Sequence, residues 1–220
     1  MHFDMQTLWQ AIPLLAEGLK LTVLLVVVSL VIGMGIGAIA CAGSMIRRGL
    51  FYHMSVSYIA LFRALPETVL MFWIYFCGPL VFDIRLTDLT SAIATLAIIS
   101  GASLAEIFRS GIEAVPRGQI EAGRAVGLSA WSVGRDVVLP QAIRVMLPAF
   151  FNFVTIIIKN SALVSAIGVA EIFYQANVFA GQTLRYFEVF SAVGVIYFLL
   201  IFPLSMLAQH TERRLAASAR

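Results

Sequence analysis

Long apolar runs separated by short polar stretches dominate the pattern of this chain. Five runs are long enough to cross a bilayer as helices, since a helical span needs about 20 apolar residues. They cover residues 20–42, 56–81, 89–108, 142–166 and 189–209. The runs show neither the alternation of a half-buried strand nor the two-faced pattern of a soluble helix. The pattern predicts an all-α membrane protein with about five transmembrane helices.

Composition supports a membrane protein in the lipid bilayer. Apolar residues make up 60% of the 220 residues and charged residues only 12%, whereas soluble domains carry about 25% charged residues. The net charge of +3 is spread between the apolar runs, and no basic patch interleaved with aromatics indicates a nucleic-acid partner. Cys41 and Cys77 lack metal-ligand spacing to other Cys or His residues. We interpret both as packing residues and expect no metal site.

The basic residues between the runs are unequally divided between the two sides of the membrane, which predicts orientation. One side carries Arg47, Arg48, Arg109, Arg117, Arg124, Arg135, Arg213, Arg214 and Arg220. The other side carries only Arg85 and Arg185, and residues 1–19 have no Lys or Arg. We therefore expect residues 1–19 to form a periplasmic N-terminus and residues 210–220 a cytoplasmic tail.

The longest connection, residues 109–140, falls on the cytoplasmic side in this arrangement. Residues 119–126 are typical of a short helix, and Gly127 favours the left-handed conformation that ends one. Ser129 can cap a second short helix over residues 130–138. The sequence thus predicts a pair of short helices at the inner face of the membrane.

The first of these short helices has one face built from small side chains. Ala122, Ala125 and Val126 lie three and four residues apart and share that face, so another protein could approach closely. Glu121 and Arg124 add polar contacts. On these residues alone, a surface loop that simply lies on the membrane explains the pattern equally well.

At this point the residues resemble a known family. Glu121-Ala122-Gly123, Gly127 four residues later, and Leu139-Pro140 at this spacing closely resemble the EAA loop of bacterial ABC importer permeases. Further segments of the sequence resemble the polar amino-acid branch of that family. These segments are Ala105 to Ile112, Gly118-Gln119, Leu139 to Arg144, Phe62 to Pro66, and Lys159 to Leu163. The resemblance covers nearly the whole chain, in order and with the right number of spans.

Three positions depart from the family pattern. The third residue of the loop triplet is usually Ala and is Gly123 here, a change between small residues that should still permit docking. Ala64-Leu65 stand where Gly-Thr usually precedes Pro66, and Ala162 lacks a hydroxyl that the family often has. Any contact based on that hydroxyl is therefore in doubt.

The resemblance implies a type I ABC importer permease fold over residues 20–209, in a bacterial inner membrane. The chain has no G-x-x-x-x-G-K-[ST] phosphate loop, so it is not expected to be an enzyme or to hold a cofactor; ATP binds to partner subunits. In the family, the loop helices dock on a cytoplasmic ATPase, and closure of two ATPases rocks two permease halves.

The implied coupling residues are Gly118, Glu121, Ala122, Gly123, Ala125, Gly127, Leu139 and Pro140. The implied partners are a second permease subunit, identical or paralogous, two cytoplasmic ATP-binding subunits, and a periplasmic or surface substrate-binding protein.

Ionisable residues inside spans are functional candidates because burying them in a bilayer is costly. Lys159 stands about 17 residues into its run, roughly 25 Å at 1.5 Å per residue, which places it toward the outer side. There it could attract a substrate carboxylate, extend outward to water, or pair with Glu67. Asn160 and Ser161 could line the pathway or bridge helices. For Arg63 and Glu106, near the cytoplasmic ends of their runs, we favour extension to water or ion pairing with other subunits.

Together these features predict a channel-forming subunit of an ATP-driven importer of polar amino acids. The residues from Arg63 to Pro66, followed by those from Leu70 to Tyr75, slightly favour glutamate and aspartate as substrates. The alternative is a membrane protein outside the ABC class, such as a small secondary carrier or an assembly factor. A secondary carrier is expected to show inverted repeats with broken helices in both halves, and we find none.

Overall fold

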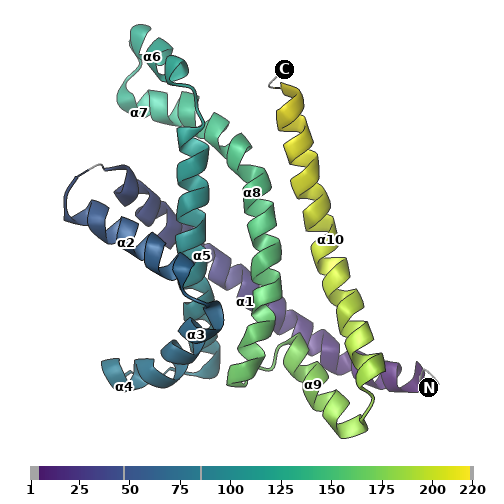
Figure 1. Ribbon diagram of the computed structural model, residues 1–220. Coiled ribbons are helices and arrows are strands. Elements are labelled where there is room, and N and C mark those ends of the chain that lie inside the picture. The colour runs from purple at the N-terminus through teal and green to yellow at the C-terminus, as the bar shows by residue number, and fades with distance from the viewer. Residues whose placement is uncertain (1–4, 47, 85, 219–220) are drawn as a thin grey trace.

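The computed structural model describes residues 5–46, 48–84 and 86–218, and these residues form a helical protein with short connections (Figure 1). The long helices are α1 (Met5–Met45), α2 (Leu50–Ala64), α5 (Asp88–Glu113), α8 (Leu139–Asn160) and α10 (Tyr186–Ser218). The shorter elements are α3 (Glu67–Phe72), the π-helical turn η1 (Trp73–Cys77), α4 (Gly78–Phe82), α6 (Arg117–Ala125), α7 (Ala130–Ser132), the π-helical turn η2 (Val133–Val138), the 3-10 helix η3 (Ser161–Ile167) and α9 (Ile172–Thr183). Arg47, Arg85 and Arg220, which enter the charge count, lie outside the described residues.

Four segments of the described chain are long and apolar enough to cross a membrane. They are Met5–Met45, Asp88–Glu113, Ala130–Ile167 and Tyr186–Leu215. A fifth is a bent pair, Leu50–Ala64 with Glu67–Phe82, whose two parts meet at 107°. The expectation of about five spans agrees with this arrangement when the bent pair counts as one span.

Helix α1 begins well before the first predicted span. It starts at Met5 rather than near residue 20 and runs for 41 residues, which corresponds to about 60 Å at 1.5 Å per residue. That is twice the roughly 30 Å thickness of a bilayer core, so part of α1 lies outside the core or the helix tilts strongly. Glu17 and Lys20, at the start of the predicted span, are exposed positions within a continuous helix.

The second predicted span, residues 56–81, is interrupted by a sharp break. Leu65 and Pro66 adopt extended backbone conformations, with ψ angles of 137° and 131°. Proline disfavours the helical region for the residue before it and cannot donate a backbone hydrogen bond. The chain therefore turns between α2 and α3 instead of continuing straight.

Close packing of α1 on α5 depends on two glycines of α1. A Cβ atom at Gly33 would lie 2.5 Å from Ser100 Cβ, and one at Gly37 would lie 3.0 Å from the Gly101 carbonyl oxygen. Gly35 faces open space, because a Cβ atom there would meet nothing within 4 Å. Small residues at such spacing let membrane helices approach closely. Helices α1 and α5 therefore form the central helix pair of the fold.

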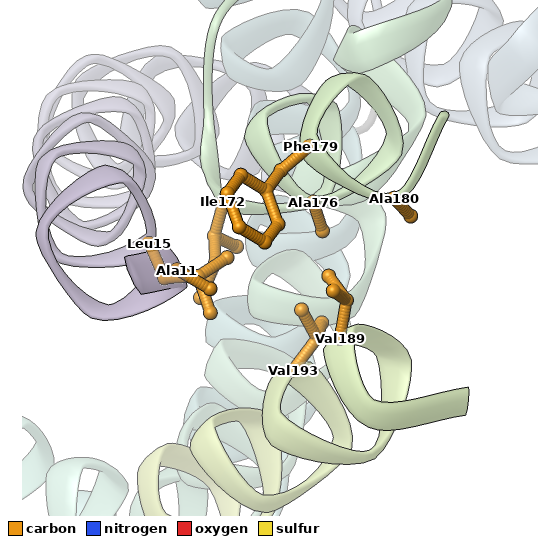
Figure 2. Close-up of a cluster of buried hydrophobic side chains, with 8 residues drawn as sticks. All are labelled: Ala11, Leu15, Ile172, Ala176, Phe179, Ala180, Val189 and Val193. Atoms are coloured by element: carbon orange, nitrogen blue, oxygen red, sulfur yellow. The ribbon is translucent and has the colours of Figure 1, made fainter. Parts of the chain in front are cut away.

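Helix α9 lies between residues 166 and 189, where the hydrophobic pattern predicts a connection outside the spans. It packs between α1 and α10 around a buried apolar cluster shown in Figure 2. The cluster consists of Ala11 and Leu15 from α1, Ile172, Ala176, Phe179 and Ala180 from α9, and Val189 and Val193 from α10. This packing, rather than the 12-residue length of α9, keeps it folded.

The two ends of the molecule carry different elements. Figure 1 shows α6, α7 and the C-terminal end of α10 at one end, called the α6 end here. The start of α1, α4 and α9 lie at the opposite end, called the α9 end. Because α5 and α8 run between these ends, they connect the short helices of residues 117–138 to the rest of the bundle.

Candidate functional site: the α6 segment and the cavity beside Lys159

Helix α6 ends in a well-formed Schellman motif. The N–H of Leu128 donates to the carbonyl oxygen of Gly123 at 3.1 Å, and the N–H of Gly127 donates to that of Arg124 at 3.0 Å. This motif needs a left-handed residue after the helix, and Gly127 has φ of 83°. The glycine that the sequence marks as a helix stop therefore fixes the direction in which the chain leaves α6.

The second short helix of this segment begins where the sequence predicts. Ser129 is the N-cap of α7, and its hydroxyl accepts a hydrogen bond from the Ser132 N–H at 3.1 Å. The turn η2 then continues the helix into α8, where Leu139 and Pro140 occupy the first turn and are exposed. Residues 117–138 are thus an ordered helical hairpin rather than a flexible linker.

The exposed surface of this hairpin is unusually apolar for a loop. Val126 is 78% exposed and Trp131 is 76% exposed, and Leu128 and Leu139 are also exposed. Large exposed apolar groups of this kind mark binding surfaces. The hairpin therefore presents a surface suited to contact with another protein.

Most predicted coupling residues face outward, and one does not. Exposed positions are Gly118, Glu121, Ala122, Ala125, Gly127, Leu139 and Pro140. Gly123 is buried, and a Cβ there would lie 3.2 Å from Val133 Cγ2. The small residue at 123 thus holds the two arms of the hairpin together, whereas we expected it to contribute to the docking face.

Lys159 lies in the last turn of α8 and is exposed. It lines a cavity of about 430 Å³ between η3, α9 and α10, whose walls also include Ala162, Phe173, Phe190 and Tyr197. The residues that line the cavity are mainly apolar and aromatic, and Lys159 is the charged residue among them. In the described residues Lys159 forms no ion pair with Glu67.

The other predicted pathway residues occupy different environments. Asn160 is half-buried at the end of α8. Ser161 is fully buried, and its hydroxyl donates to the Ile158 carbonyl oxygen at 2.7 Å. Glu67 begins α3 directly after the Pro66 break and is half-buried. Because α3 contacts η3, the helix carrying Glu67 lies beside the element that begins with Ser161.

A buried carboxylate at the α9 end was missed at the sequence level. Glu171 is completely buried and accepts a hydrogen bond from the Tyr174 N–H at 2.8 Å. The hydroxyls of Thr22 and Tyr197 lie 3.4 and 3.5 Å from its Oε2. Burial, which outweighs these hydrogen bonds, raises the pKa of Glu171 above its ordinary value. An acidic residue flanked by Val169, Ala170 and Ile172 is the sequence signal that could have identified it.

A second charged group, closer to the α6 end, was only partly anticipated. Glu106 and Glu113 of α5 both pair with Arg109, and Arg63 of α2 lies 3.9 Å from Glu106 Oε2. We expected Arg63 and Glu106 to extend to water or to pair with other subunits, whereas the structure pairs them with each other within this chain. None of these residues shares a metal-binding cluster, since the described part of the chain has no group of three or more His, Cys, Asp or Glu suited to a metal ion.

Comparison with known proteins gives this geometry a context. Residues 29–217 match the family described as "Binding-protein-dependent transport system inner membrane component". The chain is 38% identical over 216 residues to the glutamine transport system permease protein GlnP of Escherichia coli (strain K12), which covers 98% of this chain and 99% of that protein. It is 31% identical over 220 residues to the arginine transport system permease protein ArtQ of Bacillus subtilis (strain 168). This match covers 99% of this chain and 100% of that protein.

Solved structures share the fold. The crystal structure of an amino acid ABC transporter with histidines matches with a TM-score of 0.88 and 35% sequence identity, covering 97% of this chain and 100% of that chain. An inward-facing structure of the MetNI methionine ABC transporter matches with a TM-score of 0.72 over 96% of this chain and 98% of that chain. At 20% identity, this second likeness concerns the fold alone.

The chain belongs to the family of inner membrane components of binding-protein-dependent transport systems. It is the non-catalytic permease subunit of an ABC transporter, of the class that depends on a binding protein. The slight lean toward glutamate and aspartate finds no support, because the relatives above are named for glutamine and arginine.

Proposed function

We propose that this permease forms one half of the translocation path of an ATP-driven importer of polar amino acids. The observation that carries the proposal is the ordered hairpin of residues 117–138, which presents exposed apolar side chains and no chemistry of its own. We infer that it docks on a cytoplasmic ATPase. The docking face comprises Gly118, Glu121, Ala122, Ala125, Gly127, Leu139 and Pro140, with Gly123 supporting it from within. The exposed side chains of Val126 and Trp131 extend this face.

We assign the α6 end to the cytoplasm and the α9 end to the periplasm. The hairpin and the C-terminal end of α10 lie at the same end of the molecule (Figure 1), and both carry the basic residues that favour the cytoplasmic side. The binding protein would then meet the α9 end. Since one chain supplies one bundle, a second permease subunit completes the path, and Glu67 at the α2–α3 break is proposed to line it.

For the substrate, we propose a polar amino acid of the glutamine or arginine type. Relatives named for these substrates cover almost the whole chain. The exposed ammonium group of Lys159 in a largely apolar cavity suits the α-carboxylate that every such substrate carries. Asn160 and Ser161, next along the chain, are proposed to shape the same part of the pathway.

Retention of an ATPase tests the docking proposal. A tagged permease is purified together with the ATPase, and Glu121→Arg and Gly127→Leu are compared with the unmodified protein. We expect both substitutions to reduce ATPase retention and uptake, the first by reversing charge on the docking face and the second by straining the residue at φ 83°. The control is Glu17→Arg, an exposed residue of α1 away from the hairpin. Unchanged retention and uptake in both hairpin variants would refute the proposal.

A further inference from the structure

Four residues of alternating charge connect the root of the hairpin to the break in the second span. Arg63 Nη1 lies 3.9 Å from Glu106 Oε2, Arg109 Nε donates to Glu106 Oε2 at 3.3 Å, and Arg109 Nη1 lies 3.1 Å from Glu113 Oε2. A further contact joins Arg109 Nη2 to Glu106 Oε1. The Arg63–Glu106 pair joins two different helices, whereas both pairs of Arg109 lie within α5.

One end of this series is tied firmly to the hairpin. Glu113 is the last residue of α5, and only residues 114–116 separate it from α6. Val115 in this connection is buried. Gly111 lets α5 approach α8 closely, because a Cβ there would lie 3.0 Å from the Ala142 carbonyl oxygen. The short connection and this packing place α6 directly beside the last turns of α5.

The other end of the series adjoins the bend between α2 and α3. Arg63 lies in the last turn of α2, two residues before Leu65. The middle of α2 is held on α5 by the Tyr58 hydroxyl, which donates to the Ile98 carbonyl oxygen at 2.6 Å. Beyond Tyr58, the Arg63–Glu106 pair is the polar contact between α2 and α5 nearest the bend, and Glu67 starts the helix on the far side.

The two contacts of Glu106 differ in length and exposure. Arg109 engages both carboxylate oxygens from the next turn of the same helix. Arg63 approaches one oxygen only, at 3.9 Å, and its side chain is 51% exposed. The interhelical contact is therefore the longer and more exposed of the two.

We propose that the Arg63–Glu106 pair is a latch that couples movement of the α6 hairpin to movement of α3 at the Pro66 break. This proposal rests on the docking function assigned to the hairpin. In it, Arg63 acts as a positioning residue: ATPase closure shifts α5, the charge on Glu106 carries Arg63 with it, and α3 turns about residues 65–66.

The test follows the accessibility of α3 in the assembled complex. Thr68, an exposed residue of α3, is replaced by cysteine in a Cys77→Ala background; Cys41 is buried. Labelling by a water-soluble maleimide is timed for the permease–ATPase complex without nucleotide and after trapping with ATP and orthovanadate. We expect trapping to change the labelling rate several-fold, and Arg63→Gln or Glu106→Gln to abolish that change.

Two matched variants separate the latch from a general effect of charge. Arg63→Lys keeps the cation and should retain the response, and Arg48→Gln, which removes an exposed arginine elsewhere, should also retain it. The proposal is overturned if the labelling rate still depends on nucleotide in Arg63→Gln. It is also overturned if the labelling rate does not depend on nucleotide in the permease with an unmodified Arg63–Glu106 pair. Failure of the unmodified permease to retain the ATPase would overturn the docking function and the latch together, whereas failure in the labelling alone overturns only the latch.

Discussion

The Glu171 carboxylate and the Thr22 hydroxyl lie 3.4 Å apart although they are 149 positions apart in the chain. The Ile172 N–H also donates to the Thr22 oxygen, at 3.2 Å. Gly18 leaves room for this contact, because a Cβ there would lie 2.7 Å from Ile172 Cα. The start of α9 is thus fastened to α1 by a buried polar group, and stability should depend on that group.

A first prediction concerns pH. Burial raises the pKa of Glu171 above its ordinary value of 4.5, so above about pH 4.5 the folded protein binds more protons at this site than the unfolded chain. The free energy of unfolding should therefore fall as pH rises through the raised pKa. Glu171→Gln, which keeps an acceptor oxygen but cannot ionise, should remove this part of the pH dependence.

Thermal unfolding of the detergent-solubilised permease, followed by tryptophan fluorescence between about pH 4.5 and pH 8, measures this effect. Glu188→Gln serves as the comparison for a second buried glutamate. An identical decline of Tm with pH in the unmodified protein and in Glu171→Gln would show that Glu171 does not cause it.

A second prediction concerns the contact between α1 and α5. Gly33→Leu should destabilise the permease by about 1–3 kcal/mol, because overpacking forces neighbouring groups to shift and a Cβ at Gly33 already lies 2.5 Å from Ser100 Cβ. Gly35→Leu makes the same change two residues away, where the structure leaves open space. The Tm of both variants is measured side by side. Equal losses would contradict the packing described for α1.

A third prediction concerns the hairpin surface. Trp131→Ala should weaken ATPase binding by about 2 kcal/mol, or about thirtyfold in Kd, as expected for an aromatic hot spot. Trp9, 71% exposed near the start of α1, supplies the matched control Trp9→Ala, which should leave binding unchanged. Titration of the reconstituted permease with purified ATPase gives both Kd values. Equal Kd values for the two variants would exclude Trp131 from the docking face.

A fourth prediction concerns Lys159. Removing the cation with Lys159→Gln should raise KM for uptake by about tenfold, in line with a lost charged hydrogen bond, while Lys159→Arg should change it less. Lys20, the only other lysine of the chain, provides Lys20→Gln as a control of equal charge change. Initial rates of uptake against substrate concentration give KM and kcat separately. A KM that is the same in Lys159→Gln and Lys20→Gln would remove Lys159 from the pathway.

The sequence predicted the hairpin best because its signals are local. Gly127 and Ser129 act within a few residues through backbone conformation and capping, so their positions can be read without tertiary information. Even so, the inward orientation of Gly123 depends on packing against Val133. A resemblance at the level of residue type cannot distinguish a docking contact from an internal one.

The features that were missed depend on contacts between distant segments. Helix α9 carries no long apolar run, and it is stabilised by a cluster drawn from α1 and α10. Glu171 gains its partners only when Thr22 and Tyr197 are brought to it. The early start of α1 was missed because Glu17 and Lys20 interrupt the apolar pattern, whereas an exposed charged residue does not end a helix.

The central claim is that this chain serves an ATP-driven importer, and uptake into sealed vesicles tests it most directly. Proteoliposomes containing the permease and its ATPase, supplied with the binding protein, are given radiolabelled glutamine or arginine, with and without ATP. We predict accumulation of at least one amino acid that requires ATP hydrolysis and is lost in Glu121→Arg. Uptake that proceeds without ATP under an ion gradient, and that Glu121→Arg leaves intact, would contradict the account.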